Sequence, residues 1–218
     1  MGGDIGESVI TTNRPKLPNI LIYGDSFTNP LETLLWTQAN ELRSIDFRYY
    51  TQCTLKDYIA EHKPDMYRCA EQWTKIMLAA GADRAEVYET DGNPVAYGEK
   101  ILDPALPTVL VYGHMDVMPV DPVDLWKTKP FEPVVKDGKI WARGADDDKG
   151  QAFMHAKAFE YLVKSGKLNC NVKFMIEGEE EIGSPNLPKF CREHKDMLKA
   201  DVILVSDTSM IGPDIPSI

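Results

Sequence analysis

The stretch PTVLVYGHMD at residues 107–116 is a run of β-branched and apolar residues that ends in the polar side chains of His114 and Asp116. A run of this composition is typical of a strand in the interior of a sheet. Two further apolar runs, at residues 171–176 and 201–205, also lead into acidic residues. The sequence therefore predicts three buried strands, each followed by side chains that can bind a cation.

Helical and hairpin patterns surround these strands. Asp65 is placed to begin a helix that stops at Gly81, and turn residues at 91–94 separate two short strands. Apolar periodicity predicts helices at residues 148–164 and at about 186–198. Strands that alternate with helices predict an α/β fold with a mostly parallel sheet flanked by helices.

The N-terminal part of the chain has a weaker pattern. Residues 1–18 show no periodicity and predict a flexible lead-in, whereas residues 19–23 predict a strand. An apolar-periodic stretch from Pro30 to Leu42 predicts a helix. A strand at residues 46–50 and a short helix at 54–61 complete a small α/β segment.

Composition limits the partners. The 218 residues carry 34 acidic and 24 basic side chains, a formal charge of −10, which argues against nucleic acid and anionic membranes. No apolar run has the length of a membrane span, and the N-terminus has no basic segment followed by an apolar core. The four cysteines form no CxxC pair, so a reducing, cytoplasmic location is expected.

Acidic groups follow each of the three apolar runs. His114 and Asp116 follow the first run, residues 179–181 are three glutamates after the second, and Asp207 follows the third; residues 146–148 are three aspartates at a predicted helix start. In an open α/β sheet the carboxyl ends of the strands converge on one crevice. Carboxylates and an imidazole gathered there repel one another unless a cation lies among them. The mixed set suits zinc, with manganese or cobalt as alternatives.

Each motif alone also has a structural interpretation. An isolated HxD pattern is often incidental, three aspartates can simply begin a helix, and three glutamates can form a solvated turn. Their joint occurrence at strand ends favours a metal site. Residues two apart on a strand face the same side, so Asp116 can accept the second ring N–H of His114 and fix its tautomer.

At these residues the chain resembles the co-catalytic zinc amidohydrolases, which include carnosinase-like dipeptidases, acetylornithine deacetylase, succinyl-diaminopimelate desuccinylase and glutamate carboxypeptidases. The resemblance lies in YGHMDV at 112–117, RGADDDKG at 143–150, EGEEEIGS at 177–184, and Ser206-Asp207. Trp126 with Pro130-Phe131 favours the dipeptidase branch.

The resemblance implies a role for each site residue. His114 and Asp207 would bind one metal, Glu181 the second, and Asp147 would bridge both. Glu180 would be the general base, and Asp116 would orient His114. Asp146 and Asp148 match variable positions. The implied reaction is hydrolysis of the amide bond in dipeptides or small acyl-amino acids by water activated between two zinc ions. The full-length form is expected to be a homodimer.

The chain also departs from this family. The resemblance covers residues 64–218 and implies a catalytic core that stops before a lid and dimerisation domain and before a further ligand histidine. His62, His155 and His194 match no ligand position. A catalytically incomplete metal-binding fragment is therefore one alternative.

A second alternative comes from residues 19–63. The stretch ILIYGDSFT at residues 20–28 resembles the first block of the SGNH hydrolases, in which Ser26 would be the nucleophile. No partner Asp-x-x-His follows in this chain, and a serine without its base is a weak nucleophile.

Overall fold

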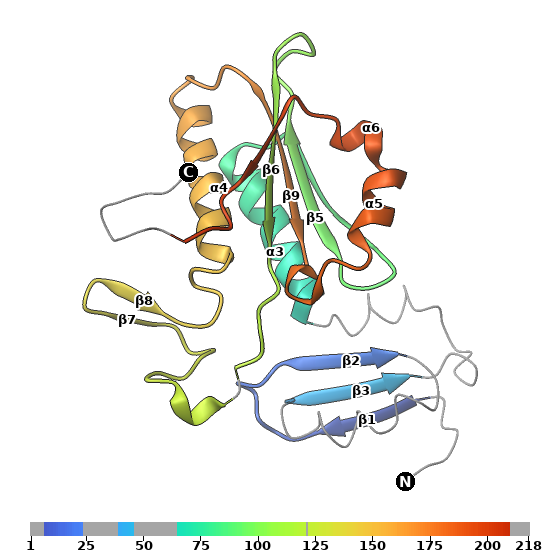
Figure 1. The fold of residues 1–218 in the computed structure, drawn as a ribbon, viewed down its shortest axis with the longest axis vertical. Helices are drawn as coiled ribbons and strands as arrows, with labels where there is room; N and C mark the ends of the chain where they lie inside the picture. The colour runs from blue at the N-terminus through green and yellow to red at the C-terminus, as the bar shows by residue number, and fades with distance from the viewer. Residues whose placement is uncertain (1–6, 24–38, 46–64, 121, 210–218) are drawn as a thin grey trace. The chain divides into compact units, whose positions relative to one another are not determined.

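The computed structural model describes residues 7–23, 39–45, 65–120 and 122–209 (Figure 1). The chain divides into two compact units, Met1–Arg68 and Cys69–Ile218. The expected border at residues 63/64 lies close to this division, and the three-part domain scheme stays a prediction.

The N-terminal unit contains a three-stranded sheet in the order β1-β3-β2. Strand β1 (Glu7–Thr11) pairs antiparallel with β3 (Glu41–Ile45), and β2 (Asn19–Tyr23) pairs parallel with β3. The strand at residues 19–23 is confirmed.

Two predictions in this unit differ from the structure. The lead-in contains β1, and Leu42, assigned above to a helix, lies buried in β3. Both segments are short, and over such lengths pairing with a neighbouring strand decides the conformation. Ser26, the strand at 46–50, the helix at 54–61 and most of the predicted helix from Pro30 lie outside the described residues.

The second unit is built on a five-stranded sheet in the order β10-β6-β9-β5-β4. Its strands are β4 (Arg84–Tyr88), β5 (Val95–Lys100), β6 (Thr108–His114), β9 (Asn171–Glu177) and β10 (Val202–Val205). Strands β10, β6 and β9 are parallel, and β5 is antiparallel to both of its neighbours. The predicted α/β fold with a mostly parallel sheet is confirmed, because β5 alone runs against the other strands of this sheet.

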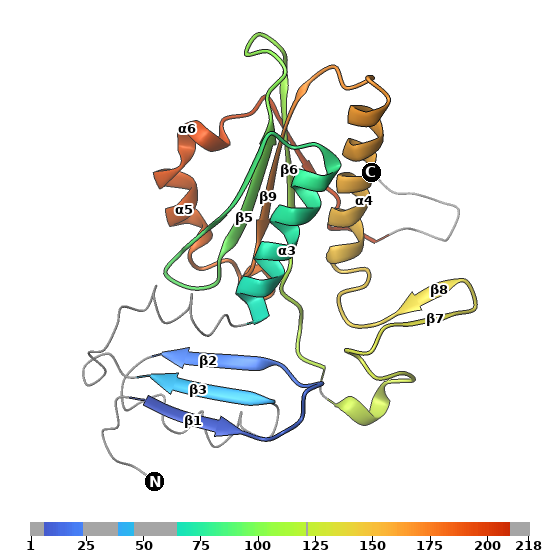
Figure 2. The same cartoon turned by 180° about the vertical axis from the view of Figure 1, so that it is seen from behind.

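Helices cover both faces of this sheet. Figure 2 shows α3 (Asp65–Ala80) and α4 (Lys149–Lys164) on one face. Phe174 of β9 packs on Phe159 of α4 on that face, with ring centroids 5.4 Å apart. On the other face, Met175 packs with Phe190 of α5 (Leu187–Glu193). Adjacent residues of β9 thus bury side chains on opposite faces, as a fully covered strand requires.

The helices agree with the sequence in most respects. Helix α3 ends before Gly81, whose φ of 112° suits only glycine. The helix expected at about 186–198 is divided into α5 and α6 (Lys195–Leu198), which meet at His194. Strands β7 (Val134–Lys136) and β8 (Lys139–Trp141) pair antiparallel and form a hairpin around Asp137-Gly138.

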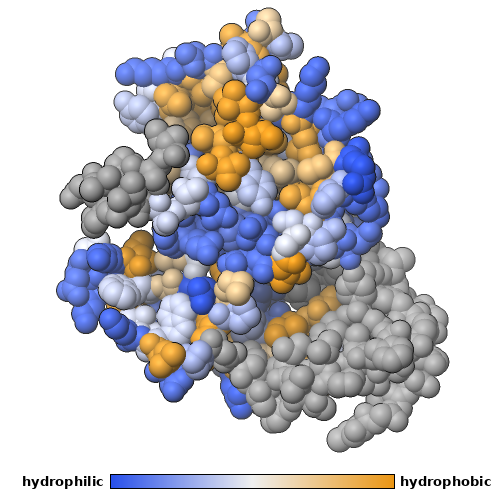
Figure 3. Space-filling model, viewed as in Figure 1, coloured by the Kyte–Doolittle hydropathy of each residue, from blue (hydrophilic) through white to orange (hydrophobic). Residues whose placement is uncertain are grey.

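The prediction that all three apolar strands are buried is wrong for β10, which lies at the edge of the sheet and is exposed along its whole length. Hydrophobic residues gather on the upper part of the face drawn in Figure 3, where Figure 1 draws this strand. Within the described part of the chain, no helix is both long and apolar enough to cross a membrane.

The contact between α4 and the sheet makes a stability test. Phe174 is 1% exposed, whereas Phe153 on α4 is 42% exposed. Phe174→Ala should lower the free energy of unfolding by about 3–5 kcal/mol, because it leaves a cavity in the core. Phe153→Ala should lower the free energy of unfolding by well under half of that amount, because its side chain is partly exposed. Urea unfolding of both variants measures the difference, and equal losses would contradict the proposed core.

Candidate metal site

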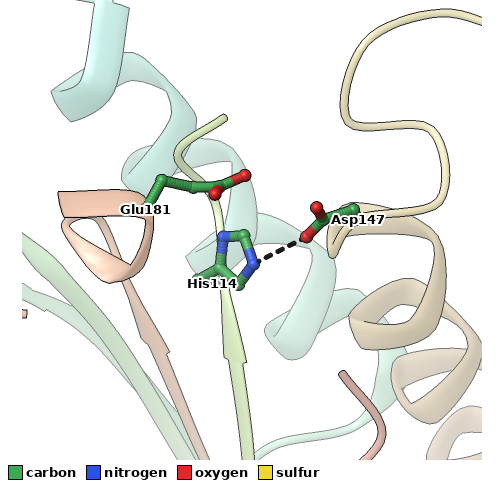
Figure 4. A group of neighbouring side chains, drawn as sticks. All are labelled: His114, Asp147 and Glu181. Atoms are coloured by element: carbon green, nitrogen blue, oxygen red, sulfur yellow. Dashed lines mark hydrogen bonds and ion pairs between the residues drawn. The ribbon is translucent and has the colours of Figure 1, made fainter. Parts of the chain in front are cut away.

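The site lies where β6, β9 and β10 end. His114 is the last residue of β6 and is aligned with Glu177, the last residue of β9. Asp207 follows β10 by two residues. Figure 4 shows three side chains that approach one another from different segments: His114 from β6, Asp147 from the loop before α4, and Glu181 from the turn after β9.

His114 is the centre of this group. Its side chain is fully buried, and its two ring nitrogens have different surroundings. Nε2 lies 3.1 Å from Asp147 Oδ1, 3.5 Å from Asp207 Oδ2 and 3.9 Å from Glu180 Oε2. Nδ1 lies 3.2 Å from Asp116 Oδ1 on the opposite side of the ring. The structure therefore brings together the residues that the sequence selected.

The donor atoms fit a divalent cation. One ligand atom from each of His114, Asp147 and Glu181 lies within 4.8 Å of the others, and the same holds for His114, Glu180 and Asp207. Imidazole nitrogen with carboxylate oxygen is a donor set that zinc accepts. Both groups include His114. The candidate ligands therefore form one cluster and do not separate into two independent metal sites.

The electrostatics of the site favour positive charge. Burial by itself would lower the pKa of His114, but the carboxylates of Asp116, Asp148 and Asp207 outweigh it and raise this pKa to about 9. Burial acts to raise the pKa of Asp116, yet hydrogen bonds from His114 and from the Glu181 amide hold it below its ordinary value. A bound cation would take the place of the proton on His114.

Asp116 has a second set of contacts that the sequence did not reveal. Its Oδ1 accepts a hydrogen bond from the backbone N–H of Glu180 at 3.2 Å, and its Oδ2 accepts one from Glu181 at 2.9 Å. Asp116 therefore faces both His114 and the turn that carries Glu180 and Glu181. The sequence carried no signal for these bonds, because 64 residues separate Asp116 from Glu180.

Asp148 contacts the residues of the site directly, although it matches a variable position in the amidohydrolase family that the sequence resembles. It is 2% exposed, and its Oδ2 accepts the backbone N–H of His114 at 3.0 Å. It occupies the N-cap position of α4, as the predicted helix start implies, but its side chain makes no capping hydrogen bond and binds the His114 backbone instead. Burial, with the charges of Asp207 and Asp147, raises its pKa to about 6 against the opposing effect of His114.

Gly113 permits this close contact. A Cβ at Gly113 would lie 2.7 Å from Asp148 Oδ2 and 3.1 Å from Ala152 Cβ. The glycine in the strand thus lets the first turn of α4 approach β6. Lys149 follows Asp148, and its Nζ donates to the Met115 carbonyl at 3.1 Å.

The other two histidines in the described part of the chain do not join the group. His155 Nε2 lies 2.7 Å from Ser206 Oγ, and His194 packs against Tyr88 and Phe190. Neither histidine lies among the candidate ligand groups, and His62 lies outside the described residues.

Metal binding tests the group directly. His114→Ala should abolish tight zinc binding, because both ligand groups include this residue. His194→Ala should leave binding unchanged and serves as the matched control. Isothermal titration with zinc measures both variants, and tight binding by His114→Ala would refute the site.

The raised pKa of His114 makes a second prediction. The folded metal-free protein holds a proton up to a pKa of about 9, whereas the unfolded chain releases it at about 6.5. This contribution to stability is complete below pH 6.5 and is lost as the pH rises through 9. Between pH 6 and pH 9.5 the free energy of unfolding should fall by on the order of 2–3 kcal/mol.

Urea unfolding of chelator-treated protein at the two pH values measures this fall. His114→Gln should lack most of it. An equal fall in the variant would assign the proton to another group.

Known proteins resemble the part of the chain that carries this candidate site. Residues 110–216 match Peptidase family M20/M25/M40. The human Beta-Ala-His dipeptidase is 41% identical over 130 residues, which are 57% of this chain and 25% of that protein. The Schizosaccharomyces pombe Cys-Gly metallodipeptidase is 37% identical over 150 residues, 64% of this chain and 32% of that protein.

A solved structure agrees in fold. An M20 family metallo-carboxypeptidase from Sulfolobus solfataricus superimposes with a TM-score of 0.62 at 36% identity, over 66% of this chain and 32% of that chain. The present chain thus spans about a quarter to a third of the length of these relatives. Residues 110–216 of its second unit, which include the acidic groups at the strand ends, form a domain of the M20/M25/M40 peptidase family.

Proposed function

We propose that this chain is the catalytic core of a metal-dependent dipeptidase, which hydrolyses the amide bond of dipeptides or small acyl-amino acids with Glu180 as the general base. The observation that supports this most strongly is the convergence of Asp147, Glu180 and Asp207 on one ring nitrogen of His114. The related dipeptidases named above support the substrate class.

Two divalent ions, zinc by preference, would be held by His114, Asp147, Glu181 and Asp207. When bound, such ions lower the pKa of a water molecule and polarise the carbonyl of the substrate. Neither of the other described histidines supplies a further ligand, so the second ion would use a donor outside these four residues.

Glu180 is suited to move a proton. Its side chain is 37% exposed, so it reaches the solvent from the edge of the site. Burial, with the charges of Asp207, Glu181 and Asp116, raises the pKa of Glu180, although His114 opposes this. A carboxylate with a raised pKa is a stronger base. Glu180 would take the proton of the attacking water and deliver it to the leaving amine.

Asp116 would keep this base in place. It orients the His114 ring from the Nδ1 side and accepts the N–H groups of Glu180 and Glu181. A single carboxylate therefore sets the relative positions of a metal ligand and the base.

Several features remain proposals about the whole protein. A homodimeric full-length form and a cytoplasmic location are predictions from the resemblance and from cysteine usage. Cys170 and Cys191 are in no disulfide, which is compatible with a reducing compartment. The SGNH-like segment at residues 19–63 would instead support an esterase. Chelation distinguishes the two activities, because it would stop the dipeptidase and leave a serine esterase active.

Glu180→Ala provides the main test. Hydrolysis of β-Ala-His or Cys-Gly with zinc or manganese present should fall at least about 100-fold, because the proton acceptor is lost. Metal content should stay close to that of the parent chain. Glu193→Ala, on α5, is the control and should keep full activity.

Two outcomes would overturn the proposal. If the metal-loaded parent chain hydrolyses no dipeptide, it is not a dipeptidase core. If Glu180→Ala loses metal and activity together, Glu180 is a ligand and not the base.

A further inference from the structure

The segment Glu177–Ser184 contains two kinds of acidic residue. Glu180 and Glu181 face the metal site, whereas Glu177 and Glu179 are 2% and 5% exposed and are not used in the proposed reaction. Glu177 accepts hydrogen bonds from Tyr112 Oη at 2.6 Å and Ser184 Oγ at 2.8 Å. Buried carboxylates are costly unless they are hydrogen-bonded, so the partners of Glu179 indicate what it does.

Glu179 binds two segments that lie outside the metal site. Its Oε1 accepts the backbone N–H of Asn93, in the turn between β4 and β5, at 2.9 Å. Its Oε2 accepts the backbone N–H of Asn186, just before α5, at 3.3 Å. The Asn186 side-chain amide donates to both oxygens, at 3.1 and 3.0 Å. These donors fix the carboxylate in one place.

The backbone of Glu179 also closes the turn that carries Glu180, the proposed general base. The Glu179 carbonyl accepts the N–H groups of Ile182 at 3.2 Å and Ser184 at 2.8 Å. Asn93 also holds the preceding residue, because its side-chain amide donates to the Gly178 carbonyl at 2.8 Å. The turn is therefore attached on one side to Asn93 and Asn186, and on the other side to Asp116.

We infer that Glu179 is a positioning residue: its buried carboxylate anchors the turn at 180–182 to the β4–β5 hairpin and to α5, and so holds Glu180 and Glu181 against His114. Glu179 touches none of the reacting atoms and acts through its neighbours in the chain. This inference rests on the proposed function for its effect on turnover, but its effect on metal binding can be measured separately.

Gly92 offers a way to displace this carboxylate without removing it. A Cβ at Gly92 would lie 1.8 Å from Glu179 Oε1 and 2.6 Å from Asn186 Nδ2. Gly92→Ala must therefore push the Glu179 side chain out of its place. Aspartate is shorter than glutamate by one methylene, so Glu179→Asp makes room for the added methyl group.

The experiment compares Gly92→Ala, Glu179→Asp and the double variant. Gly92→Ala should weaken zinc binding about 10-fold to 100-fold, as loss of a group that orients metal ligands does. It should lower kcat by a similar factor with little change in KM, and hydrogen exchange at the amides of Glu180 and Glu181 should become faster. The double variant should recover most of both losses.

Asp91→Ala is the control. Asp91 occupies the same turn, and its carboxylate pairs with Lys189 at 2.6 Å on the surface. This variant should keep zinc affinity, kcat and slow exchange at Glu180 and Glu181. Its thermal unfolding measures what the Asp91 side chain, with its Lys189 ion pair, contributes to stability.

Three results would overturn the inference. Gly92→Ala could keep the parent zinc affinity and exchange rates, the double variant could be no better than Gly92→Ala, or Asp91→Ala could cause the same losses. A parent chain that binds zinc but hydrolyses no dipeptide would refute the proposed function, whereas the zinc affinities and exchange rates would still decide the role of Glu179.

Discussion

The repulsion among carboxylates at the ends of β6, β9 and β10 is the constraint on which the site depends. Asp147, Glu180 and Asp207 all lie within 4 Å of one nitrogen of His114, and Asp116 and Asp148 stand close behind it. Such a group is stable only if positive charge lies among the acids. The carboxylates raise the pKa of His114 because a proton on its ring reduces their repulsion. A divalent cation would reduce this repulsion further, because it carries more positive charge than a proton.

A scaffold of hydrogen bonds holds these acids against their repulsion. Asp148 binds the backbone of His114, and Asp116 binds the N–H groups of Glu180 and Glu181. Glu179 attaches the same turn to Asn93 and Asn186 on its other side. Each of these three carboxylates binds backbone N–H groups, whereas the side chains of Asp147, Glu180 and Glu181 lie in the candidate metal-binding groups around His114. Rigid support of this kind is what ligand geometry and proton transfer need.

The region that matches the M20 peptidases includes both the candidate ligands and the carboxylates that support them. The matching region, residues 110–216, contains all six predicted site residues together with Asp148 and Glu179. The relatives are three to four times longer than the stretch they share with this chain. The shared stretch therefore includes the ends of the parallel strands where the candidate ligands lie, and the proteins that share it are named as a dipeptidase and as a carboxypeptidase.

The sequence by itself determined the α/β fold and the strands that end in acids, and it selected candidate site residues that the structure brings close together. Buried strands are recognisable because continuous apolar runs such as residues 108–112 are rare outside sheet interiors. Only the tertiary structure decided which of three adjacent aspartates binds the His114 backbone, and that Glu179 turns away from the metal site. It also decided that Leu42 lies in a strand and that His194 interrupts a helix. These features depend on contacts between residues far apart in the chain, and neighbouring identical side chains carry no local signal that distinguishes them.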